Sequence, residues 1–326
     1  MPLPDWARAH GCPLFSAQMR TTPADFRVTE CLGWELSGDG EHDFLWIEKT
    51  GANTEWVARQ LARHADVPNK DIGYAGLKDR HAVTRQWFSV PRWNLPDWDR
   101  LEIDGVEVLD VQRHQKKLRR GAHKANAFEI VLRGDDLGSH AAALDARMDA
   151  IRDQGVPNYF GEQRFGRGGA NLQLADDWAA GKRLPRHKRS LAISTVRSFL
   201  FNEELDRRVR EGTWNRLVPG DTANLDGTGS VFDIECLDDE LEKRCEEMDI
   251  HPTGILAGEG SPVVREDWSG ALSAARVHPG VRSLRARLNE PLAETCNQTV
   301  RLSFALTRGS YATSVLREIG DLTPKR

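Results

Sequence analysis

The sequence has few cysteines, and their spacing does not suggest a metal site or a disulfide framework. Five cysteines occur among 326 residues, their number is odd, and no Cys-x-x-Cys pair is present. Structural zinc sites and small disulfide-stapled folds depend on closely spaced or paired cysteines. We therefore expect reduced thiols, as is usual in a cytoplasmic protein.

Long hydrophobic runs are also missing. No apolar stretch approaches the ~20 residues that span a bilayer, and the opening MPLPDWARAHGC lacks the apolar core of an export signal. We expect neither a membrane segment nor an export signal. A hydrophobic fraction of 39% and a length of 326 residues suit one large packed domain or two medium ones.

The common motifs of phosphate, metal and serine chemistry do not occur. The sequence contains no GxxxxGK[ST], HExxH or GxSxG, and it lacks the paired His and Cys motifs of zinc deaminases. The glycine run GRGGA at 166–170 lacks the strand and spacing of a dinucleotide-binding turn. An enzyme with this sequence is thus expected to use no metal or cofactor, and a carboxylate nucleophile is a leading candidate.

Positive charge is not in excess overall, but it is concentrated locally. The net charge is −4, yet 113–124 carries six Lys or Arg and no acid, 182–189 carries five, and 276–287 carries four. A single run of this kind is usually a solvated face, whereas three without acids in an acidic chain favour a phosphate-binding surface. The acidic run 235–249 is expected to be an exposed helix. The best candidates for phosphate contacts are Lys116, Lys117, Arg119, Arg120, Arg186, Lys188 and Arg189.

Hydrophobic periodicity predicts strands and helices in a mixed order. An α+β fold therefore suits the chain better than a doubly wound parallel sheet. Gly- and Pro-marked stretches at 155–169 and 278–283 are candidate domain crossings. The predicted strands cover 42–48, 127–133 and 299–306, and the predicted helices cover 54–65, 141–153 and about 195–210.

One segment combines a turn with a carboxylate among cations. Residues 73–90 read GYAGLKDRHAVTRQWFSV, in which Asp79 lies between Lys78 and Arg80 and precedes a predicted buried strand. Nearby cations favour the ionised form of a carboxylate, and an ionised carboxylate can act as a nucleophile. From spacing alone, an exposed turn with an ordinary charge cluster remains the commoner explanation.

The same segment, AGLKDRHAVTRQWFS, closely resembles the signature of the TruD family of tRNA pseudouridine synthases. Further resemblances follow in the same chain order, so the likeness spans essentially the whole sequence. They are TTPADFRVTE at 21–30, EKTGANTEWVARQLA at 48–62, KANAFEIVLRG at 124–134, GVPNYFGEQRFGR at 155–167 and GSYATSVLREI at 309–319.

The resemblance implies a reaction and a fold. The family isomerises uridine to pseudouridine in RNA, bacterial members at tRNA position 13, and the Asp of the LKDRH motif, here Asp79, is the nucleophile. The implied fold is an α+β pseudouridine synthase catalytic domain with a mixed, mainly antiparallel sheet, interrupted by an α/β insert domain. We expect the catalytic domain at 1–155 and 283–326 and the TruD-type insert at 156–282.

The resemblance also implies substrate-binding residues. Phe26 matches the aromatic residue of the DFxVxE motif, Asn126 matches the pocket Asn expected to bind the base edge, and Phe128 lies two residues further on the same strand. Tyr311 stands where the family often has Phe, and Arg20 stands where Lys is common. Without the resemblance, Phe26 and Phe128 are more simply explained as core aromatics.

Several alternatives remain open at this point. Asp79 could attack C1′ or remove a proton from C2′. The chain could be a noncatalytic RNA-binding protein, or a synthase that acts on another RNA. A glycoside hydrolase is disfavoured because the Asp79 segment shows no second carboxylate. With tRNA as partner and a two-domain architecture, we expect a cytoplasmic monomer.

Overall fold

In the computed structural model, which describes residues 3–261 and 265–325, the chain divides into two compact units. Unit 1 comprises Met1–Pro13, Asp149–Arg287 and Ser310–Ile319. Unit 2 comprises Leu14–Met148, Leu288–Gly309 and Gly320–Arg326. Within the described residues, no helix combines the length and apolar character that a membrane crossing requires.

Unit 2 is built around a mixed sheet that contains ten strands within the described residues. Its main path runs β14-β15-β7-β2-β5-β3-β6, with β1 beside β7 and β16, and β4 beside β5. Most neighbouring strands are antiparallel, whereas β2 pairs with β5 and β1 with β16 in parallel. The strands are β1 (Ser16–Met19), β2 (Phe26–Cys31), β3 (His42–Thr50), β4 (Gly73–Tyr74), β5 (Val83–Pro91), β6 (Val106–His114), β7 (Ala125–Arg133), β14 (Leu288–Cys296), β15 (Thr299–Thr307) and β16 (Asp321–Pro324).

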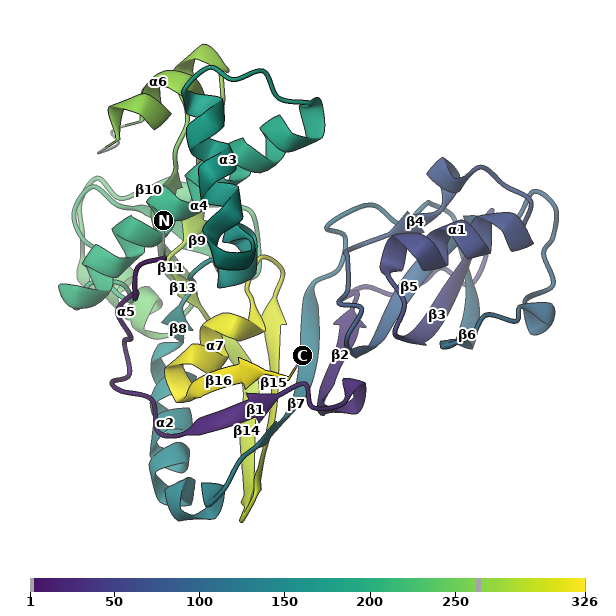
Figure 1. The fold of residues 1–326 in the computed structure, drawn as a ribbon, viewed down its shortest axis with the longest axis horizontal. Coiled ribbons are helices and arrows are strands. Elements are labelled where there is room, and N and C mark those ends of the chain that lie inside the picture. The colour runs from purple at the N-terminus through teal and green to yellow at the C-terminus, as the bar shows by residue number, and fades with distance from the viewer. Residues whose placement is uncertain (1–2, 262–264, 326) are drawn as a thin grey trace. The chain divides into compact units, whose positions relative to one another are not determined.

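Helix α1 (Thr54–His64) packs on the β3–β5 part of this sheet (Figure 1). Val57 and Leu61 are four residues apart, lie on one helix face and are fully buried. Burying such a side chain contributes roughly 1.5–3 kcal/mol. The helix thereby fixes the position of its own first residue, Thr54, against the sheet.

Unit 1 combines helices with a four-stranded antiparallel sheet of order β10-β9-β11-β12 and the strand pair β13-β8. Its core gathers aromatic side chains from several helices, including Phe199 of α4 and Trp268 of α6. The elements are β8 (Val156–Pro157), α3 (Ala170–Ala179), α4 (Arg186–Arg210), β9 (Thr222–Leu225), β10 (Val231–Asp233), α5 (Asp239–Glu246), β11 (Ile250–Leu256), α6 (Glu266–Ala274), β12 (Gly280–Ser283), β13 (Arg285–Ala286) and α7 (Ala312–Ile319).

The remaining helical segments connect these elements. Helix α2 (Ala141–Gln154) carries the chain from unit 2 into unit 1. Short 3-10 turns lie at Pro23–Asp25, Asn69–Asp71, Trp98–Arg100, Leu137–His140, Glu162–Phe165 and Arg167–Gly169.

The predicted α+β class with a mixed, mainly antiparallel sheet is confirmed. The compact units divide the chain at 148/149 and 287/288, and they also place Met1–Pro13 and Ser310–Ile319 with the middle of the chain. Side-chain hydrogen bonds explain this grouping of the terminal segments. The backbone N–H groups of Ala9 and His10 donate to Glu318. The assignment of 156–282 as a separate insert domain stays a prediction.

Candidate active site

Asp79 lies in the turn that leads into β5 of unit 2. Its Oδ2 forms an ion pair with Nη1 of Arg20 at 2.7 Å, and its Oδ1 accepts a hydrogen bond from the backbone N–H of His81 at 3.0 Å. The side chain keeps 30% of its surface exposed. The carboxylate is therefore held at both oxygens and still accessible to a substrate.

Arg20, the cation that pairs with Asp79, has an unusual backbone conformation. It follows β1 with φ of 58°, in the left-handed region that costs a non-glycine residue on the order of 1–3 kcal/mol. Its guanidinium carbon lies 4.2 Å from the centroid of the Phe26 ring while it pairs with Asp79. The fold thus maintains a strained residue at the point where a cation meets the carboxylate.

Buried polar groups fix the backbone of the Asp79 turn. The backbone N–H of Lys78 donates to Oγ1 of Thr54 at 2.9 Å, and the Thr54 hydroxyl donates to Oε1 of Gln86 at 2.9 Å. The Gln86 amide in turn donates to the carbonyl of Gly76 at 3.2 Å. The start of α1 and the buried face of β5 therefore hold the turn from two sides.

A buried lysine binds the backbone of the Asp79 turn. Nζ of Lys49 donates to the backbone carbonyl of Asp79 at 3.1 Å and to that of Ala52 at 2.8 Å. Burial lowers the pKa of Lys49 to about 8, while the charge of Asp79 raises it and that of Lys78 lowers it. Lys49 anchors the Asp79 backbone, and its charge interacts electrostatically with the Asp79 carboxylate.

Lys78 joins a buried ion pair to the predicted pocket residue Asn126. Its Nζ lies 3.0 Å from Oε2 of Glu30, and the two side chains are 5% and 0% exposed. The same Nζ donates to Oδ1 of Asn126 at 2.6 Å, and the backbone N–H of Trp87 donates to Oε1 of Glu30. Because the ammonium is buried between two oxygens, it orients the amide of Asn126.

The other end of this amide faces His123. Nδ2 of Asn126 lies 3.3 Å from Nε2 of His123. Burial, followed by the charges of Lys78 and Arg308, lowers the pKa of His123 to about 4. The imidazole is therefore neutral near pH 7, so its Nε2 can accept a hydrogen bond from the Asn126 amide.

The predicted aromatic residues of unit 2 pack against one another. The rings of Phe26 and Phe128 meet edge to face at 6.2 Å, and Phe128 stacks on Phe304 at 5.5 Å. Phe26 is 4% exposed and Phe128 9% exposed, so most of each ring belongs to the core. The pair places an apolar wall beside Arg20.

Tyr311 belongs to unit 1, whereas Asp79 belongs to unit 2. Its hydroxyl accepts a hydrogen bond from Nη2 of Arg164 at 3.1 Å, and Nη1 of Arg164 donates to Ser194. The Tyr311 ring lies 6.1 Å from that of Phe160. The Tyr311 hydroxyl, which a Phe at this position would lack, is thus bound by a residue of unit 1 itself.

Comparison with known proteins decides the family. The family model "tRNA pseudouridine synthase D (TruD)" matches residues 9–174 and 170–274. The chain belongs to the TruD family. It is 44% identical to the tRNA pseudouridine synthase D of Methylococcus capsulatus, over 98% of this chain and 96% of that protein. It is also 44% identical to that of Pseudomonas putida strain W619, over 97% and 95% of the two chains.

A solved structure supports the TruD fold independently. A crystal structure from Methanosarcina mazei, named as a putative tRNA pseudouridine synthase D (TruD), matches with a TM-score of 0.74 over 98% of both chains. The sequence identity is 20%, so this match concerns the fold. The family model and the 44% identical relatives confirm the family resemblance inferred from the LKDRH segment and the other motifs.

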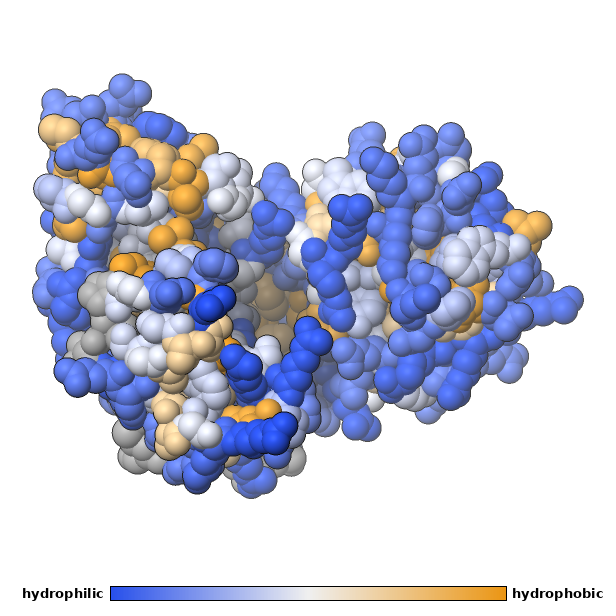
Figure 2. Space-filling view, turned by 90° about the horizontal axis from the view of Figure 1, so that it is seen from above, coloured by the Kyte–Doolittle hydropathy of each residue, from blue (hydrophilic) through white to orange (hydrophobic). Residues whose placement is uncertain are grey.

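The basic residues predicted to contact RNA are exposed in this TruD chain. Those of 116–120 lie in unit 2, and those of 186–189 lie in the first turn of α4 in unit 1. Figure 2 shows a face on which hydrophilic residues predominate, with hydrophobic ones scattered among them. The exposed basic residues are Lys116, Lys117, Arg119, Arg120, Arg186, Lys188 and Arg189.

Among the described residues, no group of three or more His, Cys, Asp or Glu side chains could hold a metal ion.

Sequence reasoning missed several residues that support the site. Glu30 lies within the DFxVxE motif and Lys78 within LKDRH, but neither motif reveals that the two side chains pair. Lys49 carries no signal beyond its place at the end of a predicted strand. Thr54 is the first residue of the predicted helix, but the sequence does not reveal that its hydroxyl contacts Lys78 and Gln86.

Proposed function

We propose that this TruD family member isomerises uridine 13 of tRNA to pseudouridine and that Asp79 is the nucleophile. The observation that carries the proposal is the partly exposed Asp79 carboxylate, bound by Arg20 and by the His81 N–H, on a turn fixed by buried groups. Curated relatives at 44% identity over nearly the whole chain are named tRNA pseudouridine synthase D. Their name supports tRNA as the substrate.

The reaction needs only proton and bond rearrangement. The C1′–N1 bond of uridine breaks, uracil turns, a C1′–C5 bond forms, and the proton on C5 is released as one is gained at N1. Asp79 assists the departure of uracil, either by bonding to C1′ or by accepting the C2′ proton. The guanidinium of Arg20 offsets the charge of the Asp79 carboxylate. It also orients the carboxylate so that one oxygen faces the sugar.

The uracil must be extruded from its stack and retained while it turns. Extrusion costs a few kcal/mol, which stacking on aromatic rings at roughly 1–3 kcal/mol per base can offset. From the family resemblance, we assign this holding role to Phe26, Phe128 and Tyr311, and recognition of the base edge to Asn126. Phe26 and Phe128 would contact the base with the small part of each ring that is exposed. The Lys78 contact fixes which end of the Asn126 amide the base can meet.

The seven exposed basic residues of 116–120 and 186–189 are assigned to the tRNA backbone. Phosphate contacts of this kind position an RNA, and shape rather than base sequence then governs recognition. We expect a cytoplasmic monomer, since tRNA is the partner and no protein subunit is required by the chemistry.

The test uses a tRNA transcript labelled with tritium at C5 of its uridines. Incubation with the protein should release tritium, and chemical mapping of the product should place pseudouridine at position 13. Binding without release would identify a noncatalytic RNA-binding protein. Release with pseudouridine at another position, or only from another RNA, would overturn the assignment of position 13.

A further inference from the structure

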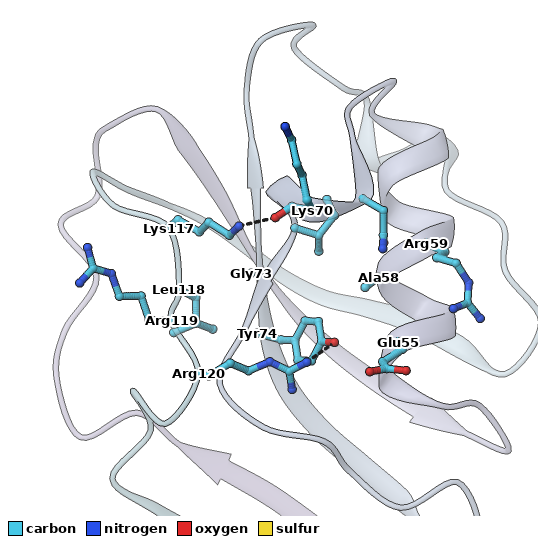
Figure 3. Close-up of a pocket in the computed structure, with 12 residues that line it drawn as sticks. Glu55, Ala58, Arg59, Lys70, Gly73, Tyr74, Lys117, Leu118, Arg119 and Arg120 are labelled. Carbon is cyan, nitrogen blue, oxygen red and sulfur yellow. Dashed lines mark hydrogen bonds between the residues drawn. The ribbon is translucent and has the colours of Figure 1, made fainter. Parts of the chain in front are cut away.

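A cavity of about 690 Å³ lies in unit 2, between α1, β4 and the basic segment 117–120 (Figure 3). Five of its lining residues are cationic and one, Glu55, is anionic. The volume lies within the roughly 300–1,000 Å³ typical of small-molecule sites, and this cationic lining occurs in a chain whose net charge is −4. The cations are Arg59, Lys70, Lys117, Arg119 and Arg120.

Packing fixes the basic segment against this cavity. Leu118, in the middle of the run, is 3% exposed, and its backbone N–H donates to Oγ of Ser89 at 2.9 Å. A Cβ at Gly73 would collide with the Leu118 carbonyl oxygen, so only glycine allows β4 and the segment to approach this closely. The ammonium of Lys117 donates to the backbone carbonyl of Lys70 across the cavity. The run is thus an anchored wall of the cavity.

An aromatic platform lies at one side of the cavity. The guanidinium carbon of Arg120 lies 3.8 Å from the centroid of the Tyr74 ring, and Arg120 donates to the Tyr74 hydroxyl (Figure 3). The Phe88 ring packs against Tyr74 at 5.8 Å. A guanidinium plane laid on an aromatic ring offers a second stacking face to an unpaired base.

We propose that this cavity binds one nucleotide of the substrate RNA other than the target uridine. Its phosphate would be held by Lys70 and Lys117, and its base would stack on the Arg120–Tyr74 pair. Positive grooves combined with aromatic stacking surfaces are the usual means of holding unpaired RNA. The inference rests on the proposed function, because it takes tRNA as the ligand, and it adds a contact to a nucleotide that does not react.

The test measures the dissociation constant of a tRNA transcript by fluorescence anisotropy at several salt concentrations. Tyr74→Ala should weaken binding by about 5- to 150-fold, the range expected for one stacking contact. Tyr74→Phe, which keeps the ring, should remain close to wild type. Lys70→Glu should weaken binding and lower the slope of log K against log salt by about one.

Lys243→Glu is the matched control, because it makes the same charge change at an exposed residue of the acidic helix α5. Unchanged tRNA affinity in both Tyr74→Ala and Lys70→Glu, or a loss no greater than that of the control, would overturn the inference. So would saturable binding of UMP or inorganic phosphate that is lost in Lys70→Glu while tRNA affinity is kept, since that would identify a free anion as the ligand.

The outcome is separable from that of the catalytic proposal. If the substitutions lower tRNA affinity as expected but neither the wild type nor the variants release tritium, the nucleotide site stands and the catalytic assignment fails. If tritium is released but tRNA affinity is unaffected by both substitutions, the catalytic assignment stands and the nucleotide site fails.

Discussion

At the residue scale, the site depends on a buried charge pair that never touches the Asp79 carboxylate. Glu30 and Lys78 are almost completely shielded from water, and Lys78 uses the same ammonium to hold Asn126. Buried pairs of this kind contribute little net stability, but breaking one leaves an uncompensated charge. In this chain, the Glu30–Lys78 pair serves to orient the Asn126 amide.

Lys78→Met should therefore be strongly destabilising. It leaves the carboxylate of Glu30 without its cation, at a cost of about 3–5 kcal/mol in the free energy of unfolding. Urea denaturation at pH 7 measures this loss. The double variant Glu30→Gln/Lys78→Met should lose less than Lys78→Met alone, since no buried charge remains. Equal losses in the single and double variants would contradict the ion pair.

Part of this residue-scale arrangement could be predicted from the sequence. The LKDRH motif pointed to Asp79 and the resemblance pointed to Arg20 as a substrate-binding residue; the structure adds that the two side chains form an ion pair at 2.7 Å. The cations next to Asp79 in sequence bind other groups: Arg80 donates to the carbonyl of Gly51, and Lys78 pairs with Glu30. Sequence adjacency does not reveal which charges meet once a turn is folded.

At the element scale, the first residue of α1 links helix packing to the turn that carries Asp79. Thr54 is buried, and its hydroxyl joins the N–H of Lys78 to the side chain of Gln86. Its position follows from the burial of the helix face below it. A change at this one hydroxyl should therefore reach the turn that carries Asp79.

Thr54→Val keeps the side-chain shape and removes the hydroxyl. It should cost about 1–3 kcal/mol, because a backbone N–H and an amide oxygen lose their partner. The single-turnover rate of pseudouridine formation should fall with little change in tRNA affinity. Thr195→Val, a comparable buried hydroxyl in α4, should lower stability and leave the rate intact. Equal rate effects would show that Thr54 does not position the turn.

Element boundaries were predictable where burial imposes a clear period. The strands at 127–133 and 299–306 agree closely with β7 and β15, which pair in continuous register. Helix α4 was expected from about residue 195, but it begins at Arg186. Its first turn is charged and exposed, so it lacks the apolar periodicity on which the prediction depended.

At the scale of the whole molecule, the acidic net charge conceals separate basic surfaces in both units. The sequence revealed these runs because they are contiguous. The grouping of Met1–Pro13 with Ser310–Ile319 was not predictable in this way, because it depends on contacts such as those of Glu318. Contacts between distant segments leave no hydrophobic periodicity in the sequence from which they could be predicted.

Charge reversal in unit 1 should weaken tRNA binding. The double variant Arg186→Glu/Arg189→Glu should raise the dissociation constant and reduce the salt slope by about two, because each substitution removes one phosphate-binding cation. The control is Arg207→Glu/Arg210→Glu near the other end of α4, where both side chains pair with acidic residues. Equal effects of the two double variants would indicate a nonspecific charge effect.

The most direct measurement compares Asp79→Asn with the wild type in single-turnover pseudouridine formation on a tRNA transcript. The substitution keeps the shape of the side chain but removes its capacity as a nucleophile or base. The rate should fall by at least about 10³-fold, while tRNA affinity and the unfolding midpoint stay close to wild type. A rate within about tenfold of wild type, a difference of only about 1.4 kcal/mol in the barrier, would contradict the assignment of Asp79.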